Sequence, residues 1–159
     1  MKAHQKTIGK NDEWLTPKWI LDPLGEFDLD PCAPIERPWD TAKNHYTILD
    51  DGLNKSWFGR IWCNPPFNRN IRQEWMLRMA NHNNGILFVP AATETKSFAR
   101  CVWGKCSGIL FLKRRPHFCY VDGTRAKANS GCTISLIAYG VDNFNILRQS
   151  GLGFTLVEV

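Results

Sequence analysis

The residues best suited to chemistry stand in one short segment, Asn64-Pro65-Pro66-Phe67. The amide oxygen of Asn64 and the backbone carbonyl of Pro65 are two hydrogen-bond acceptors. Successive prolines fix φ and so hold the Pro65 carbonyl in one direction, while Phe67 adds an aromatic face. Two acceptors beside a ring suit a planar amino group with two N–H donors, such as the exocyclic N6 of adenine. Held in this way, the nitrogen lone pair is less conjugated with the ring and can attack an electrophilic methyl group.

The cationic residues gather in another part of the chain. The formal net charge of the 159 residues is +5, yet residues 1–67 hold 8 basic and 10 acidic side chains. Residues 96–127 carry a net +7, from one acid, Asp122, and eight cations: Lys96, Arg100, Lys105, Lys113, Arg114, Arg115, Arg125 and Lys127. A local positive surface is typical of proteins that bind a nucleic-acid backbone. A solvated face that only keeps the protein soluble is the alternative.

Length and composition favour one ordinary folded domain over residues 1–159. The chain is 43% hydrophobic and 22% charged, close to the average for globular proteins. No apolar run approaches the ~20 residues of a membrane span. Residues 1–12 lack the apolar core of a secretory signal, and we expect them to form a flexible N-terminal segment. The sequence therefore predicts a cytoplasmic chain that binds no membrane.

The six cysteines do not predict a disulfide framework or a metal site. A reducing compartment disfavours disulfides, and no two cysteines are spaced as C-x2-C. The four histidines complete no ligand pattern either. We expect buried free thiols and no bound metal.

Alternating strand and helix patterns predict a three-layer α/β fold. Apolar runs favour strands over residues 27–30, 46–49, 60–63, 86–89, 109–112, 132–139 and 154–159, the last two forming a final pair. Periodicity and capping signals favour helices over 18–21, 70–80, 95–104 and 143–149, the first capped by Thr16 with Pro17 at its first position. Residues 113–129 are expected to form a basic, irregular loop.

Three unusual segments follow predicted strands. They are Asp30-Pro31-Cys32-Ala33, Asn64-Pro65-Pro66-Phe67 and the stretch from Arg114 to Phe118. Because ligands of open α/β sheets bind outside the carboxyl ends of the strands, we expect these segments to meet at one edge. No G-x-G-x-x-G loop is present, which argues against a dinucleotide site.

Four segments taken together resemble the phage-type DNA N6-adenine methyltransferase family. The likeness covers roughly residues 11–140. One segment is Trp62-Cys63-Asn64-Pro65-Pro66-Phe67, whose last four residues resemble motif IV of the S-adenosylmethionine-dependent amino methyltransferases. The other segments are Asp12-Glu13-Trp14-Leu15-Thr16-Pro17, Phe27-Asp28-Leu29-Asp30-Pro31-Cys32-Ala33 and Phe88-Val89-Pro90-Ala91. The resemblance implies a Rossmann-like S-adenosylmethionine-dependent domain, with a mostly parallel sheet and an antiparallel strand near the C-terminus. It implies an enzyme that methylates adenine N6 in DNA, in a bacterial or phage-infected cell.

The resemblance also implies roles for single residues. Asp30, with Pro31, Cys32 and Ala33, would meet the ammonium of the cofactor methionine, and Thr16 and Pro17 would close over the same end. Asp51 would contact the adenosine part, and Asn64 would lie beside the cofactor. Phe67 would stack on the base, Phe118, expected to be exposed, would help to hold it after it flips out of the duplex, and Arg114 and Arg115 would grip the flanking phosphates.

Two other functions remain open on the sequence alone. RNA and protein-amide methyltransferases share the Asn-Pro-Pro-aromatic turn, although the positive surface argues against a protein substrate. A non-catalytic nucleic-acid-binding domain could also keep this fold. The sequence leaves monomer and homodimer equally open.

Overall fold

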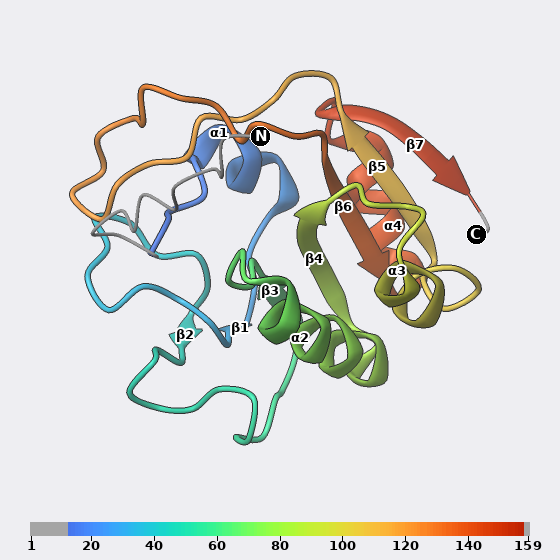
Figure 1. The fold of residues 1–159 in the computed structure, drawn as a ribbon, viewed down its shortest axis with the longest axis horizontal. Coiled ribbons are helices and arrows are strands. Elements are labelled where there is room, and N and C mark those ends of the chain that lie inside the picture. The colour runs from blue at the N-terminus through green and yellow to red at the C-terminus, as the bar shows by residue number, and fades with distance from the viewer. Residues whose placement is uncertain (1–12, 158–159) are drawn as a thin grey trace, which may run out of the picture.

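The described residues form one seven-stranded sheet. The computed structural model describes residues 13–157, so the flexible segment expected over residues 1–12 lies outside the described residues. The strands lie in the order β2-β1-β3-β4-β6-β5-β7 (Figure 1). Their bounds are β1 Leu29–Asp30, β2 Asn44–His45, β3 Ile61–Cys63, β4 Gly85–Pro90, β5 Gly108–Leu112, β6 Ile134–Tyr139 and β7 Gly153–Val157.

The sheet has a parallel half and an antiparallel half. Neighbouring strands among β2, β1, β3 and β4 are parallel, whereas β6 is antiparallel to both β4 and β5, and β7 is antiparallel to β5. The predicted α/β class is confirmed, with a mixed sheet that is only partly parallel. Two strands near the C-terminus run antiparallel, where one was expected. They do not pair with each other, because β5 lies between them.

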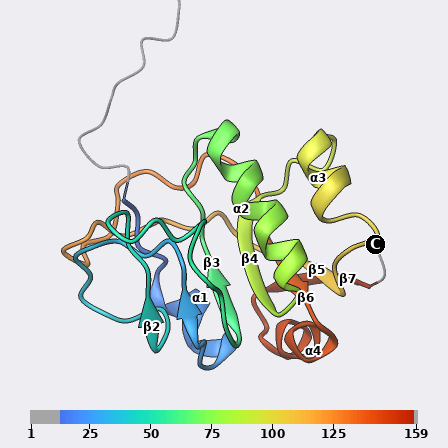
Figure 2. The ribbon, with the colours of Figure 1, turned by 90° about the horizontal axis from the view of Figure 1, so that it is seen from below.

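Helices cover both faces of the sheet. They are α1 Lys18–Leu21, a 3-10 turn Asp22–Leu24, α2 Arg69–His82, α3 Lys96–Cys101 and α4 Val141–Gln149. Figure 2 shows α2 and α3 over one face and α4 over the other. Because side chains alternate along a strand, Trp62 and Phe88 join the core beneath α1 and α4, while Ile61 and Leu87 join the core beneath α2 and α3.

Two predicted local structures are wrong. Residues 46–49 form no strand, because the Asp50 carboxylate accepts hydrogen bonds from the Thr47 backbone N–H (2.9 Å) and hydroxyl (3.0 Å) and so closes a turn. Thr16 does not cap α1. Pro17 is the N-cap residue, and no side chain caps that helix. The Thr16 side chain is instead buried and bound elsewhere.

The register of the parallel strands brings two of the predicted segments to one edge of the sheet. Leu29 of β1 pairs with Ile61 of β3, so residues 31–33 and 64–67 leave the sheet side by side. The stretch that follows β5 is joined to residues 13–16. Leu15 and Cys119 exchange backbone hydrogen bonds of 2.9 and 3.0 Å.

All six cysteines are free, and Cys63, Cys101 and Cys119 among them are buried. Over residues 13–157, no helix is both long and apolar enough to cross a membrane.

Candidate active site

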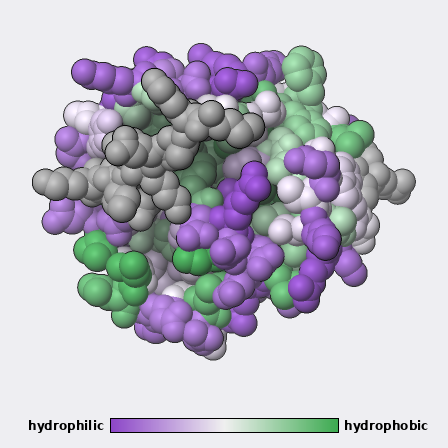
Figure 3. Space-filling view, in the orientation of Figure 1, coloured by the Kyte–Doolittle hydropathy of each residue, from purple (hydrophilic) through white to green (hydrophobic). Residues whose placement is uncertain are grey.

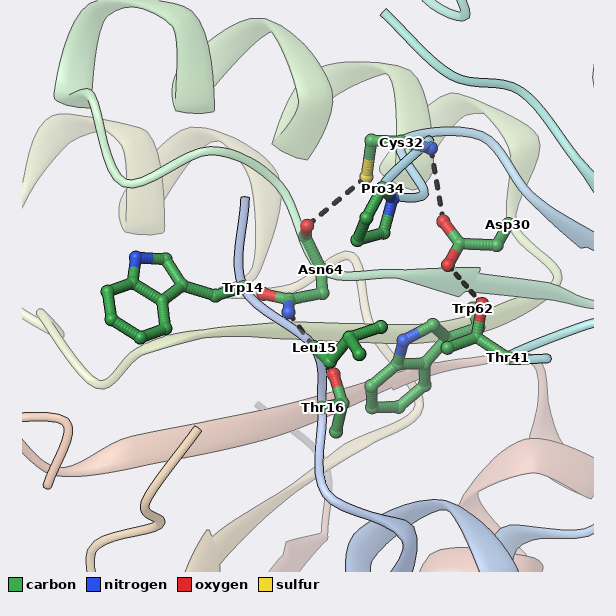
Figure 4. Close-up of a pocket in the computed structure, with 9 residues that line it drawn as sticks. All are labelled: Trp14, Leu15, Thr16, Asp30, Cys32, Pro34, Thr41, Trp62 and Asn64. Atoms are coloured by element: carbon green, nitrogen blue, oxygen red, sulfur yellow. Dashed lines mark hydrogen bonds between the residues drawn. The ribbon is translucent and has the colours of Figure 1, made fainter. Parts of the chain in front are cut away.

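Asn64 is held from two sides (Figure 4). Its side-chain Nδ2 donates to the Thr16 hydroxyl at 3.2 Å, and its backbone carbonyl accepts a hydrogen bond from the Cys32 thiol at 3.2 Å. Burial and the neighbouring Cys63 raise the pKa of the Cys32 thiol well above its usual value, so the thiol keeps its proton and can donate. Thr16 therefore orients the side-chain amide of Asn64, and Cys32 holds its backbone.

Asp30 is a buried carboxylate at the end of β1. It is 3% exposed, accepts a hydrogen bond from the Cys32 backbone N–H at 3.1 Å, and bonds closely to the Thr41 hydroxyl. Burial raises the pKa of Asp30 to about 6, although the bonds from Thr41 and Cys32 act in the opposite direction. The ionised carboxylate is therefore costly to hold here unless a cation joins it.

A small cavity joins Asp30 to Asn64. Its lining residues are Trp14, Leu15, Thr16, Asp30, Cys32, Pro34, Thr41, Trp62 and Asn64. The described residues leave only about 10 Å³ open in it, room for one water molecule. The segment of residues 14–16 forms one wall, so a larger group can enter only if this wall moves.

A second, larger cavity lies on the other side of Trp14. It has a volume of about 280 Å³ and is lined by Trp14, Phe67, Phe118, Tyr120, Ala126, Ala128, Asn129 and Ser130. The Phe67 ring, 40% exposed, meets the edge of Phe118 with centroids 5.5 Å apart and planes at 89°. The Trp14 ring packs on the Tyr120 ring, with centroids 5.2 Å apart. Four of the eight lining residues are therefore aromatic, around a space wide enough for a planar ring.

A hairpin-like turn within residues 118–126 builds the outer wall of this cavity. Ala126 N–H donates to the Phe118 carbonyl and Tyr120 N–H to the Thr124 carbonyl, both at 2.8 Å. The loop predicted to be irregular is thus locally paired. Phe118, expected to be exposed, is only 4% exposed because its ring packs on Phe88 beneath the cavity floor. It still reaches the cavity through its contact with Phe67.

The basic stretch of residues 96–127 is divided between two parts of the molecule. Lys96 and Arg100 belong to α3, which packs beside α2. Arg114 stacks on Trp19 of α1 on the opposite face, with its guanidinium 4.4 Å from the ring centroid. Hydrophilic side chains line the upper and left border of the molecule (Figure 3), where residues 113–129 run in Figure 1. The charge predicted as one surface is therefore two, and the part within residues 113–127 adjoins the larger cavity.

One of three comparisons with known proteins identifies a family. The model of a family described as DNA N-6-adenine-methyltransferase (Dam) matches residues 4–147. The chain belongs to this family. No curated protein and no solved structure matches.

Membership of the DNA N-6-adenine-methyltransferase family confirms the resemblance that the sequence motifs indicated. Its members methylate the N6 nitrogen of adenine in DNA, which decides against the RNA, protein-amide and non-catalytic alternatives. The roles of single residues in this methyltransferase stay predictions. The structure divides these residues between the two cavities. Asp30, Cys32, Thr16 and Asn64 share the smaller cavity, whereas Phe67 and Phe118 share the larger one.

Other predicted residues of the methyltransferase lie outside both cavity linings. Asp51 is exposed in a turn with φ of 52°, bound to Asn54 at 2.7 Å. That turn packs on the segment that follows β1, because a Cβ on Gly52 would meet the Pro31 carbonyl oxygen at 2.0 Å. Ala33 and Pro17 are buried beside the smaller cavity, and Arg115 is exposed.

The sequence did not predict several residues in and around the two cavities. Thr41 and Trp62 line the smaller cavity, and Tyr120 lines the larger one. Arg72 was also missed, although it follows the Asn-Pro-Pro-Phe segment by only five residues. Its Nη1 donates to the Phe67 carbonyl at 3.2 Å and so holds the turn after the prolines. Among these residues, only Thr41 had a feature in the sequence that could have pointed to a site, namely a hydroxyl group in a loop rich in prolines.

Replacement of Asp30 by Asn tests the electrostatic state of the smaller cavity. The pKa of Asp30 rises from 3.8 in the unfolded chain to about 6 in the folded protein, so the folded state binds the carboxyl proton more tightly. Ionisation of Asp30 then lowers the stability of the wild type progressively from about pH 4 to pH 6.

Asp30→Asn removes this cost and keeps the acceptor for the Cys32 N–H. We expect the two proteins to unfold with similar free energies at pH 4, and the variant to be more stable by about 2–3 kcal/mol at pH 7. Urea denaturation at both pH values measures this difference. Parallel pH profiles for the two proteins would contradict it.

Proposed function

We propose that the chain transfers a methyl group from S-adenosylmethionine to N6 of an adenine that has left the DNA duplex. In this proposal the base occupies the larger cavity against Phe67, and the methionine end of the cofactor enters the smaller one beside Asp30. The observation that carries the proposal is that one turn reaches both cavities, since Asn64 lines the smaller one and Phe67 lines the larger one.

The hydrogen bonds of the Asn-Pro-Pro-Phe turn support a role in binding an amino group. Nδ2 of Asn64 is occupied by Thr16, so Oδ1 of the same amide faces the opposite way. Within residues 13–157, no group donates to Asn64 Oδ1 or to the Pro65 carbonyl. Both acceptors are therefore available for the two N–H bonds of the adenine amino group.

The larger cavity supports extrusion of the base. Inside a duplex the target nitrogen is stacked and cannot reach the turn, so the nucleotide must rotate out of the helix. About 280 Å³ of space beside the partly exposed Phe67 can receive a purine, and four of the eight lining residues are aromatic. Stacking on such walls compensates for part of the energy of unstacking the base.

The donors and acceptors of the smaller cavity suit the methionine end of S-adenosylmethionine. A buried carboxylate with a raised pKa, as at Asp30, is stabilised by an ammonium group. When bound, the cofactor supplies an electrophilic methyl group. Thr16 and Cys32 keep Asn64 facing the reaction centre. The wall of residues 14–16 must move to admit the cofactor, although Leu15 exchanges two backbone hydrogen bonds with Cys119 and the Thr16 carbonyl accepts one from Trp39 Nε1.

The chemistry asks for orientation more than for proton transfer by the protein. Asn64 Oδ1 and the Pro65 carbonyl accept the two N–H bonds and thereby aim the nitrogen lone pair. As the amino nitrogen forms its bond to the methyl carbon, the methyl–sulfur bond of the sulfonium would break and its electron pair would stay on the departing thioether sulfur. The resulting cationic amine would then release one proton to solvent. No general base is needed before the attack, and the protein contributes by fixing the position of the amino group.

The cations near the larger cavity support binding of the flanking phosphates. Lys127 stands between the lining residues Ala126 and Ala128, and its side chain is exposed. Arg115 is exposed within residues 113–129, and the Arg114 guanidinium stacks on the Trp19 ring. Contacts to phosphates position DNA without reading its sequence.

Asn64→Ala tests the proposed role of the amide oxygen. Loss of one of two acceptors for the reacting amino group should lower the single-turnover rate of methyl transfer about 100-fold or more, with a much smaller change in cofactor affinity. Transfer of labelled methyl from S-adenosylmethionine to an adenine-containing duplex measures the rate.

Asn70→Ala is the matched control, since Asn70 is an exposed residue in the first turn of α2. It should keep the wild-type rate. A rate for Asn64→Ala within about twofold of wild type would remove Asn64 from the reaction, and failure of wild type to methylate would remove the whole proposal.

Substitution of Arg114 and Arg115 by Gln tests the proposed DNA-binding surface. Each lost phosphate contact should reduce the slope of log K against log salt by about 1, so the double variant should bind all duplexes more weakly with a shallower slope. Fluorescence anisotropy over a salt series measures both. Arg148→Gln, an exposed position in α4, serves as the control. An unchanged slope for the double variant would exclude this pair from the interface.

A further inference from the structure

One buried donor in the smaller cavity has no partner. In residues 13–157, three buried side-chain nitrogens lack a hydrogen-bond acceptor: Arg60 Nη2, Trp62 Nε1 and Trp75 Nε1. Of these residues, Trp62 alone lines one of the two cavities. A buried donor without an acceptor destabilises the protein, so a ligand group that accepts a hydrogen bond from Trp62 Nε1 would bind more tightly.

The direction of the Trp62 N–H is fixed by packing. The residue is fully buried in β3, two positions before Asn64, and its ring packs on Phe27 and Phe88 with centroid distances of 5.4 and 5.6 Å. Figure 4 shows the indole nitrogen on the side of the ring that faces Pro34 and Asp30. The donor and the Asp30 carboxylate therefore line the same small space.

A free donor and a buried carboxylate together match both charges of an α-amino acid. The ammonium group pairs with Asp30, and the carboxylate group needs a donor. No lysine or arginine is among the residues that line this cavity. Arg37 lies close enough to influence Asp30, but its guanidinium already binds Asp40 and the Pro34 carbonyl. This leaves the Trp62 N–H as the buried donor without a partner.

We propose that Trp62 Nε1 donates a hydrogen bond to the α-carboxylate of the cofactor's methionine end while Asp30 binds its ammonium group. This inference rests on the proposed function, because it takes S-adenosylmethionine as the ligand. It adds a second recognition point, which makes the smaller cavity selective for an intact amino acid. Trp62 is then a binding residue and takes no part in methyl transfer itself.

Trp62→Phe removes the N–H and keeps a buried aromatic ring. A hydrogen bond to a charged group contributes about 1.5–3 kcal/mol, so the dissociation constant for S-adenosylmethionine should rise about 10- to 100-fold. Isothermal titration calorimetry without DNA measures it. Trp75→Phe is the matched control. It removes another buried indole N–H that lacks an acceptor among the described residues, but that side chain lines neither cavity, and the affinity should stay unchanged.

Decarboxylated S-adenosylmethionine shows whether the donor meets the carboxylate. Wild type should bind this analogue at least about 10-fold more weakly than the intact cofactor. Trp62→Phe should discriminate much less between the intact and the decarboxylated cofactor, because the variant lacks the N–H that would meet the carboxylate. If Trp62→Phe does not fold, the comparison of the two ligands on wild type still decides, since equal affinities would overturn the proposal.

The outcomes separate this inference from the proposed function. A Trp62→Phe variant that binds the intact cofactor like wild type overturns the role of Trp62, and so does one that weakens both ligands equally. Either result leaves the methyl donor itself unaffected. If wild type binds neither ligand, the proposed function fails together with the inference.

Discussion

The site depends on the fixed orientation of one amide group. Asn64 follows β3, and its side-chain nitrogen and backbone oxygen are both taken up by neighbouring segments. The partners come from residues 13–16 and from the segment after β1, which the parallel pairing of β1 and β3 brings to the same edge. Because one end of the amide is occupied, its oxygen is left for a ligand. The rigid double proline then places a carbonyl beside that oxygen.

The two cavities differ in the kind of group that their lining residues can bind. The smaller one buries a carboxylate at a cost to folding, as the raised pKa of Asp30 indicates, which is a common feature of binding sites. The larger one is walled by aromatic rings and adjoins cations. The two cavities share Trp14 as a lining residue, and the Asn-Pro-Pro-Phe turn reaches the smaller one through Asn64 and the larger one through Phe67.

The sequence predicted the parts of the site that depend on local chemistry. The position of Asp30 and Asn64 after strands followed from strand patterns and the rule for ligand sites in α/β sheets, and the family resemblance added Thr16. Trp62 was not predicted, because one aromatic residue in an apolar strand looks like any other core residue. Its unmet donor becomes visible only when every neighbour is placed.

Other failures came from long-range pairing and from competing local bonds. Phe118 was expected to be exposed because its loop is basic, but the ring packs on Phe88, which is distant in the sequence. Residues 46–49 have the side chains of a strand, yet the Asp50 carboxylate closes a turn there. The cations of residues 96–127 are contiguous in sequence but belong to two faces, a separation that depends on how the sheet is covered.

The most direct measurement is a crystal structure with S-adenosylhomocysteine and a duplex that contains the target adenine. The account predicts an extruded adenine stacked on Phe67, with its N6 about 3 Å from both Asn64 Oδ1 and the Pro65 carbonyl oxygen. An adenine bound elsewhere, or one whose amino group meets neither oxygen, would contradict it.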